Sequence, residues 1–150
     1  MKAAEEMSSM TINELADKMI QMRFFAPEEL VSFPGSIPNR GEERVLLFLY
    51  KQNSHIMVGD LTESFGLSTG RMANILRQLE EKKLILRTQQ KDDKRKFEVT
   101  LTKKGLKHSE ELLRNLQEQH QKFLKQMGKK DAEELLRLLE KAVKISDSHS

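Results

Sequence analysis

The fifteen residues KDDKRKFEVTLTKKG, Lys91–Gly105, carry six cations and three acids. Within them Phe97, Val99 and Leu101 alternate with charged or polar residues, which is the period-two pattern of a strand with one buried face. The cations that precede this strand are typical of an exposed turn, and the lysines that follow it begin a helix.

A second strand is predicted immediately before the cationic turn. LILRTQQ, residues 84–90, and KFEVTL, residues 96–101, have strand patterns, and a turn at Lys91–Lys94 joins them. The sequence therefore predicts a two-stranded hairpin with a basic tip. A solvated turn without function is the alternative explanation of that tip.

Two short helices are predicted before the hairpin. MVGDLTESFGL, residues 57–67, has helical spacing and reaches Gly66, a residue that commonly ends helices. STGRMANILRQLEEKK, residues 68–83, follows at once, with Ser68 as its N-cap. A glycine turn between short helices indicates a helix-turn-helix, whose second helix can enter the DNA major groove. An ordinary α-hairpin is the alternative, and the hairpin that follows favours a winged helix-turn-helix.

The second helix separates into an apolar and a polar face at about 100° per residue. Its inward face consists of Met72, Ile75, Leu76 and Leu79. The side chains and backbone predicted to contact DNA are those of Ser68, Thr69, Gly70, Arg71, Asn74, Arg77 and Gln78. Arg and Asn suit bidentate contacts with guanine and adenine edges, and the first helical turn can hold a phosphate.

The charge distribution agrees with an anion-binding middle segment. The whole chain has 26 Lys and Arg against 23 Asp and Glu, but residues 68–104 carry eleven against five. That segment therefore has a net charge of +6, and the remainder has 15 − 18 = −3. A local basic face on a mildly acidic protein is typical of nucleic-acid binding.

Several classes of protein are disfavoured by composition. The longest apolar run, VLLFLY at residues 45–50, is far shorter than a membrane span, and the N-terminal MKAAEEMSSM does not resemble a secretory signal. The chain has no cysteine, and its four histidines are not spaced as metal ligands, so we expect no metal, no cofactor and no thiol switch. The lack of a membrane span, a secretory signal and cysteine predicts a cytoplasmic protein, and the lack of a catalytic motif predicts that it is not an enzyme.

The chain resembles the MarR family of winged-helix transcriptional regulators over about residues 42–146. LEEKKLILR, residues 79–87, is similar to the family's passage from recognition helix to wing, and DDKRKFEVTLTKKG, residues 92–105, is similar to its D-x-R and L-T-x-x-G signatures. The resemblance implies that Arg95 enters the minor groove and that Asp93 braces the wing, pairing with an arginine such as Arg77. The implied DNA-binding residues of the wing are Lys91, Asp93, Lys94, Arg95 and Lys96.

Two departures from the family pattern stand out. The family usually has glycine where Lys83 ends the recognition helix, so this helix needs another way out of its last turn. The connector Phe24–Pro38 contains all three prolines, whereas the corresponding family segment is more helical.

The expected architecture is mainly α, with a small β-hairpin wing and terminal dimerisation helices. Residues 1–41 would form an N-terminal dimerisation helix and connector, residues 42–102 the winged helix-turn-helix, and residues 103–150 two C-terminal dimerisation helices. The apolar residues assigned to dimerisation are Leu15, Met19, Leu116, Phe123, Leu124, Leu135, Leu139 and Val143.

The leading functional hypothesis is a sequence-specific regulator of transcription, most simply a repressor. It would bind double-stranded operator DNA as a homodimer on a pseudo-palindromic site, and the resemblance implies release by a small anionic or aromatic effector. The alternative is a winged-helix protein-interaction or structural module without specific DNA readout, whose basic wing meets an acidic protein surface.

Overall fold

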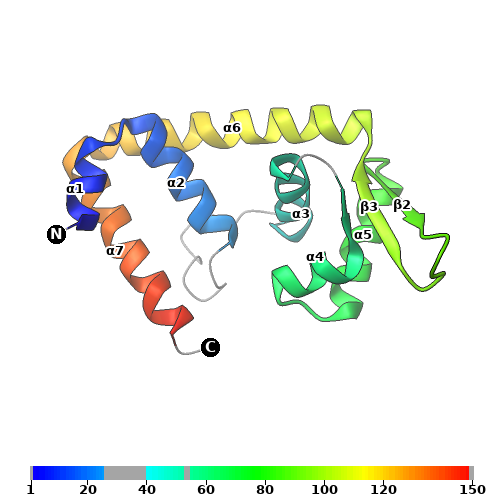
Figure 1. Ribbon diagram of the computed structural model, residues 1–150. Helices are drawn as coiled ribbons and strands as arrows, with labels where there is room; N and C mark the ends of the chain where they lie inside the picture. The colour runs from blue at the N-terminus through cyan, green and yellow to red at the C-terminus, as the bar shows by residue number, and fades with distance from the viewer. Residues whose placement is uncertain (1, 26–39, 53–54, 149–150) are drawn as a thin grey trace. The chain divides into compact units, whose positions relative to one another are not determined.

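The computed structural model describes residues 2–25, 40–52 and 55–148 (Figure 1). The elements in chain order are α1 Lys2–Ser9, α2 Ile12–Phe25, α3 Arg40–Lys51, β1 His55–Met57, α4 Val58–Phe65, α5 Thr69–Glu81, β2 Ile85–Gln89, β3 Phe97–Leu101, α6 Lys103–Met127 and α7 Lys129–Asp147. The mainly helical prediction with a small sheet is confirmed. The connector Phe24–Pro38 lies almost wholly outside the described residues.

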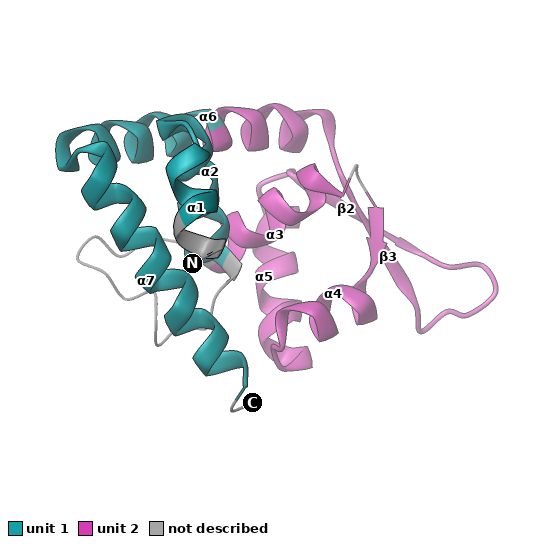
Figure 2. Cartoon of the chain, turned by 60° about the vertical axis from the view of Figure 1, so that its left-hand side comes forward, with its two compact units in different colours: residues 1–37, 114–150 teal, residues 38–113 magenta. Residues whose placement is uncertain are grey.

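The chain divides into two compact units, coloured separately in Figure 2. Unit 1 comprises residues 1–37 and 114–150, and unit 2 comprises residues 38–113. Helix α6 is continuous in the chain and contributes its first part to unit 2 and the rest to unit 1.

Unit 2 contains a winged helix-turn-helix. Its sheet is antiparallel in the order β1-β3-β2, with Arg87 paired with Val99 and Ile56 paired with the other side of Val99. The predicted hairpin of β2 and β3 is confirmed. Strand β1 was not predicted, because three residues are too few to show an alternating pattern, and it covers the free edge of β3.

The helix pair forms for the reasons that the sequence indicated. Gly66 takes the left-handed conformation, with φ of 63°, and ends α4. The Ser68 side chain accepts a hydrogen bond from the Arg71 N–H at 3.2 Å and caps α5. The predicted inward face of α5 is buried, with Met72, Leu76 and Leu79 fully covered.

Lys83 provides the exit from the recognition helix where the family usually has glycine. Its φ is 63°, which makes it the non-glycine residue with positive φ in the described part of the chain. The Lys83 N–H donates to the Glu80 carbonyl at 2.9 Å, and the Leu84 N–H donates to the Leu79 carbonyl at 3.0 Å. These two bonds form a Schellman motif, and the burial of both leucines supplies its apolar contact.

Thr102 joins the end of the wing to the start of α6. Its hydroxyl donates to the Lys83 carbonyl at 2.7 Å and accepts from the Gly105 N–H at 2.9 Å, so it caps α6. Its N–H also donates to the Leu84 carbonyl at 3.1 Å. A Cβ on Gly105 would lie 1.9 Å from that same carbonyl oxygen, so only glycine fits. The L-T-x-x-G string is therefore a structural joint.

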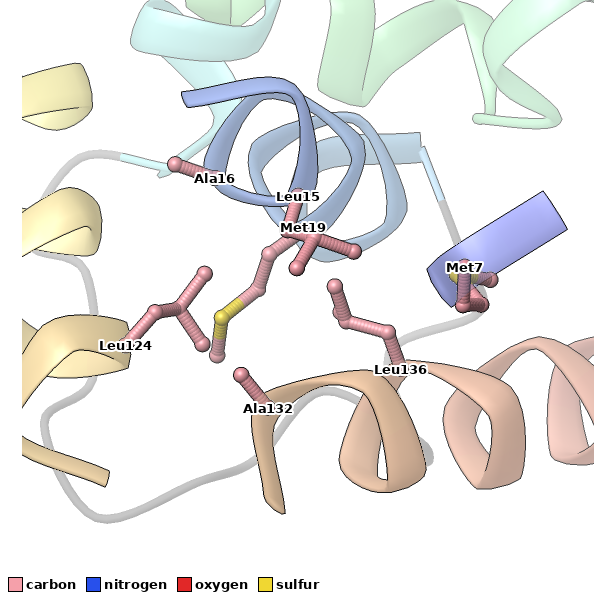
Figure 3. Packing of buried hydrophobic residues seen from close by; sticks show 7 residues of the cluster. All are labelled: Met7, Leu15, Ala16, Met19, Leu124, Ala132 and Leu136. Carbon is pink, nitrogen blue, oxygen red and sulfur yellow. The ribbon is translucent and has the colours of Figure 1, made fainter. Parts of the chain in front are cut away.

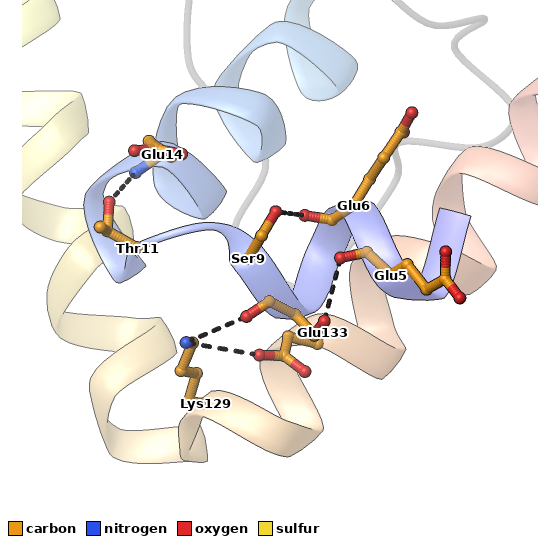
Figure 4. Close-up of polar contacts among 8 residues, drawn as sticks. Glu5, Glu6, Ser9, Thr11, Glu14, Lys129 and Glu133 are labelled. Carbon is orange, nitrogen blue, oxygen red and sulfur yellow. Dashed lines mark hydrogen bonds and ion pairs between the residues drawn. The ribbon is translucent and has the colours of Figure 1, made fainter. Parts of the chain in front are cut away.

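Unit 1 is a helical cluster with its own core. Helices α1 and α2 both pack on α7. The core residues are Met7, Leu15, Ala16, Met19, Leu124, Ala132 and Leu136 (Figure 3). Gly128, with φ of 93°, separates α6 from α7. Lys129 then links α7 to α1, because its Nζ lies 3.3 Å from the Ser8 carbonyl and 3.8 Å from Glu133 (Figure 4).

A buried histidine connects α2 and α6 within unit 1. His120 is 3% exposed; its Nδ1 lies 2.6 Å from the Leu116 carbonyl, and its Nε2 lies 2.9 Å from Arg23 Nη1. A carbonyl can only accept, so Nδ1 carries the proton and Nε2 accepts from Arg23. Burial, together with the Arg23 charge, lowers the pKa of His120, against an opposing effect of the Leu116 hydrogen bond.

Among the described residues, no helix is both long enough and apolar enough to cross a bilayer.

Candidate nucleic-acid interface

The polar face of α5 is open to solvent throughout its predicted length. Every residue assigned to it is exposed, namely Ser68, Thr69, Gly70, Arg71, Asn74, Arg77 and Gln78. The opposite face of the helix packs into the core of unit 2. The burial pattern thus gives α5 one side packed into the core and one side exposed to solvent.

Two of the base-reading candidates are paired with each other in the free protein. Arg77 Nη2 donates to Asn74 Oδ1 at 2.5 Å. This bond engages Asn74 Oδ1 and not the Nδ2 amide group, and it orients the Arg77 guanidinium. The expectation that Asp93 pairs with Arg77 is wrong, because both side chains have other partners.

Asp93 organises the tip of the wing through local bonds. Its Oδ1 accepts from the Arg95 backbone N–H at 3.0 Å and from Arg95 Nε at 3.3 Å. Its backbone carbonyl accepts from the Lys96 N–H at 3.0 Å. The backbone hydrogen bond, then the side-chain bond from Arg95, lowers the pKa of Asp93, and the carboxylate remains ionised near neutral pH. An acid two residues before the arginine thus closes the turn, which explains the D-x-R spacing.

Arg95 is the most exposed partner in this arrangement. Its side chain is 91% exposed, whereas that of Asp93 is 30% exposed. Asp93 therefore holds Arg95 through its backbone N–H and through guanidinium Nε, while the Arg95 side chain as a whole remains 91% exposed. The other predicted wing cations, Lys91, Lys94 and Lys96, are also exposed.

Other residues that stiffen the wing were not predicted. Gln89 Nε2 donates to the Lys94 carbonyl at 2.7 Å, and the Gln90 N–H donates to the Lys96 carbonyl at 2.9 Å. Their signal in the sequence was weak, because glutamine in a strand is usually a solvated residue. At the base of the wing Arg87 forms an ion pair with Glu80 of α5.

A cavity of about 820 Å³ lies within unit 2, bordered by both the helix-turn-helix and the wing. Gly59 and Thr69 line it from α4 and α5, and Arg95 and Phe97 line it from the wing. Two acids, Asp60 and Glu63, also border it. The cavity therefore has cationic, apolar and acidic walls, within the same unit as the exposed face of α5.

The residues assigned to dimerisation fall into two groups in unit 1. Leu15, Met19, Leu116 and Leu124 are buried by the chain's own helices. The residues that keep an accessible surface are Phe123, which is 46% exposed, and Leu135, Leu139 and Val143, which are partly covered. The second group is accompanied by exposed Leu138 and Ile145, which the sequence assignment did not include.

Comparisons with known proteins agree on the fold of this chain. The S. aureus MepR–DNA complex is similar with 26% identity and a TM-score of 0.59, covering 85% of this chain and 93% of MepR. The PcaV transcriptional regulator from Streptomyces coelicolor has 16% identity and a TM-score of 0.64, covering 93% of this chain and 99% of PcaV. NadR in complex with 4-hydroxyphenylacetate has 20% identity and a TM-score of 0.50, covering 87% and 88%.

A search of curated protein sequences gave no significant match. Residues 39–97 match the model of the MarR family, and this range includes the helix-turn-helix and reaches the wing arginine and the start of β3. The family match and the 26% identity to MepR point to the same assignment. Residues 39–97 of this chain, which include the helix-turn-helix, are therefore similar to the MarR family of transcriptional regulators.

Proposed function

We propose that this protein binds double-stranded DNA sequence-specifically as a homodimer and represses transcription from a pseudo-palindromic operator. The observation that carries the proposal is the wing tip, where Asp93 bonds to the backbone N–H and guanidinium Nε of an Arg95 that is 91% exposed. A tethered but exposed guanidinium is suited to insertion into a narrow, electronegative minor groove.

The recognition helix supports the same function. Its outward face combines Arg71, Asn74, Arg77 and Gln78, all exposed, above a fully packed inner face. These side chains can hydrogen-bond to base edges in a major groove, while wing lysines neutralise phosphates. The similarity to MepR, which was solved as a DNA complex, favours this use of the unit.

The apolar surface of unit 1 supports the homodimer. Phe123, Leu138 and Ile145 are each about half exposed, at 46%, 49% and 54%. Large exposed apolar side chains on α6 and α7 are costly in water and favour a second subunit. Two-fold pairing would present two recognition helices to successive turns of a palindromic site.

We further propose release by a small anionic or aromatic effector. NadR, a structural neighbour, was solved with 4-hydroxyphenylacetate, which is both aromatic and anionic. At 20% identity this neighbour supports the effector's class by analogy of fold alone.

In-vitro selection from random duplexes at physiological salt, with the purified protein, tests the proposal. We expect recovery of an inverted repeat of about 16–20 base pairs, since the two half-sites of a dimer lie about one helical turn apart. Arg95→Ala should abolish that enrichment with the fold intact, as judged by circular dichroism. Arg114→Ala, which removes an equal charge from the exposed surface of α6, should leave it unchanged.

The competing function is a protein-interaction module with a basic wing. It predicts binding to DNA that shows no sequence preference and disappears as salt rises. In that case Arg95→Ala and Arg114→Ala would reduce the residual binding to a similar extent.

A further inference from the structure

We propose that Met10, Met22 and Met127 form an oxidation site, at which a peroxide converts thioethers to sulfoxides and loosens the helices of unit 1. The chain has no cysteine, so its sulfur atoms are the thioethers of its eight methionines and no thiol competes for the oxidant. The loosening is argued from unit 1 alone, and only its consequence for DNA binding rests on the proposed function.

Methionine is concentrated in unit 1. Seven of the eight methionines lie among the described residues; two of these seven, Met57 and Met72, belong to unit 2, and five belong to the core cluster of unit 1 or pack against it. The five are Met7, Met10, Met19, Met22 and Met127. Since the two units have nearly equal lengths, one helical cluster holds most of the oxidisable side chains.

Exposure divides these five methionines into two groups. Met7 and Met19 are 0% and 5% exposed and lie inside the cluster, as Figure 3 shows. Met10, Met22 and Met127 are partly exposed, yet they pack against the same cluster. A buried methionine is protected from an oxidant in water, and a fully exposed one can be oxidised without structural effect. A partly exposed methionine that packs on a core is both accessible and structurally needed.

Two of the three accessible methionines lie at the turns between helices. Met10 lies between α1 and α2, and Met127 is the last residue of α6, directly before Gly128. Lys129 holds these two turns near each other, because its Nζ lies 3.3 Å from the Ser8 carbonyl (Figure 4). Helices α1 and α2 both pack on α7. Oxidation at the turns would therefore add polar groups where the helices are joined.

The chemistry of the step needs only a peroxide and the thioether. The sulfur attacks one oxygen of hydrogen peroxide, a sulfur–oxygen bond forms, the oxygen–oxygen bond breaks, and water leaves. Methionine is oxidised by two electrons and the peroxide is reduced by two. The sulfoxide is polar, and its oxygen needs a hydrogen-bond partner that an apolar cluster does not supply. Each oxidised side chain is thus driven out of the cluster, and α1 and α2 lose contacts with α7.

Oxidation would also disturb the surface assigned to the second subunit. Leu135 and Leu139, two of the proposed dimerisation residues, pack against the same cluster as the three methionines. A sulfoxide that leaves the cluster removes part of the support beneath these leucines. If the protein binds its operator as a dimer, the oxidised form should therefore bind DNA more weakly.

Hydrogen peroxide treatment of the full chain tests the site, with peptide mass spectrometry to locate the added oxygen. We expect oxygen on the three accessible methionines, little on Met7 and Met19, and a melting temperature lowered by at least about 5 °C. A triple variant with Met10→Leu, Met22→Leu and Met127→Leu should resist this loss, because leucine has a similar volume and no sulfur.

Met57→Leu is the matched control. Met57 is partly exposed in unit 2, so this variant removes one accessible sulfur but keeps the proposed site. It should lose as much thermal stability on oxidation as the wild type does. Treatment of the oxidised wild type with methionine sulfoxide reductases should restore the melting temperature, which distinguishes sulfoxide formation from irreversible damage.

Three results would overturn the site: no oxygen on these methionines in the folded chain, oxygen without a change in melting temperature, or an equal loss in the triple variant. If the triple variant does not fold, the three single leucine variants replace it, and each should retain part of the stability that oxidation removes. Fluorescence anisotropy with the operator duplex tests the consequence separately. Unaltered or absent DNA binding, with a lowered melting temperature, would contradict the link to DNA and leave the oxidation site in place.

Discussion

At residue scale, Gly66 and Lys83 share one backbone angle, φ of 63°, but have different side chains. Gly66 was predictable as a helix end, because glycine adopts this conformation without steric cost. Lys83 was predictable only as an anomaly, from a family position usually held by glycine. A lysine in the sequence does not by itself predict a left-handed backbone. The two Schellman hydrogen bonds and the burial of Leu84 impose that conformation on Lys83.

Lys83→Gly is therefore expected to stabilise the protein. The substitution removes about 1–2 kcal/mol of strain from the left-handed backbone. Glycine also increases the entropy of the unfolded chain, which offsets about 0.4–1 kcal/mol of that gain. The free energy of unfolding should rise by about 0.5–1 kcal/mol in urea titrations. Gly66→Ala should lower it by a comparable amount, and a loss of stability in Lys83→Gly would contradict this account.

At element scale, the sequence predicted the two strands of the wing but not the contacts of its side chains. The alternation of Phe97, Val99 and Leu101 predicted β3, and the D-x-R spacing marked Asp93 and Arg95 as a pair of interest. The sequence could not show whether Asp93 contacts Arg95 or a residue of α5. Such a contact depends on side-chain directions, which sequence periodicity does not give. Strand β1 was missed for a similar reason, since only its pairing with β3 defines it.

Neighbouring aspartates of the wing provide a matched test of the Asp93 tether. Asp93→Ala removes two hydrogen bonds to Arg95, and we expect weaker DNA binding despite the loss of a negative charge. Asp92→Ala makes the same charge change at an exposed neighbour and should strengthen binding slightly by reducing repulsion. The comparison is made by salt-dependent anisotropy; stronger binding in both variants would rule out the tether.

The contact between α2 and α6 predicts a pH dependence of stability. Burial lowers the pKa of His120 below its ordinary 6.5 in the folded chain. The unfolded chain therefore binds the proton more readily, and stability falls as the pH drops through about 6.5 toward the folded-state pKa. We expect a smaller free energy of unfolding at pH 5.5 than at pH 7.5.

The control for this effect lies on the same helix. His120→Gln should flatten the stability difference between the two pH values, whereas His108→Gln, at an exposed position of α6, should retain it. Chemical denaturation at both pH values measures the difference. An unchanged slope in His120→Gln would assign the dependence to other groups.

At the scale of the whole molecule, the exposed fraction of an apolar side chain shows whether it stabilises the folded chain or is accessible to a second subunit. Adjacent residues of α6 illustrate this, because Leu124 is 0% exposed and Phe123 is 46% exposed. Apolar periodicity marked both as dimerisation residues, since it shows which residues need cover but not whether the cover comes from the same chain.

Leu124→Ala should lower the free energy of unfolding by about 2–5 kcal/mol, which thermal unfolding detects.

Phe123→Lys should weaken the proposed dimer while the monomer remains folded. Analytical ultracentrifugation over a concentration series measures this effect. Gln121→Lys adds the same charge about 160° around the helix and should leave assembly intact. A monomeric wild-type protein at micromolar concentration would refute the dimer itself.

The Thr102 joint has a consequence for how this wing can diverge. Thr102 bonds to the carbonyls of Lys83 and Leu84, so the two ends of the hairpin are fastened together at its root. Lengthening or shortening the tip, residues 90–96, leaves those fastenings in place. The length of the wing tip can therefore differ between related proteins without a change in the helices on either side of the hairpin.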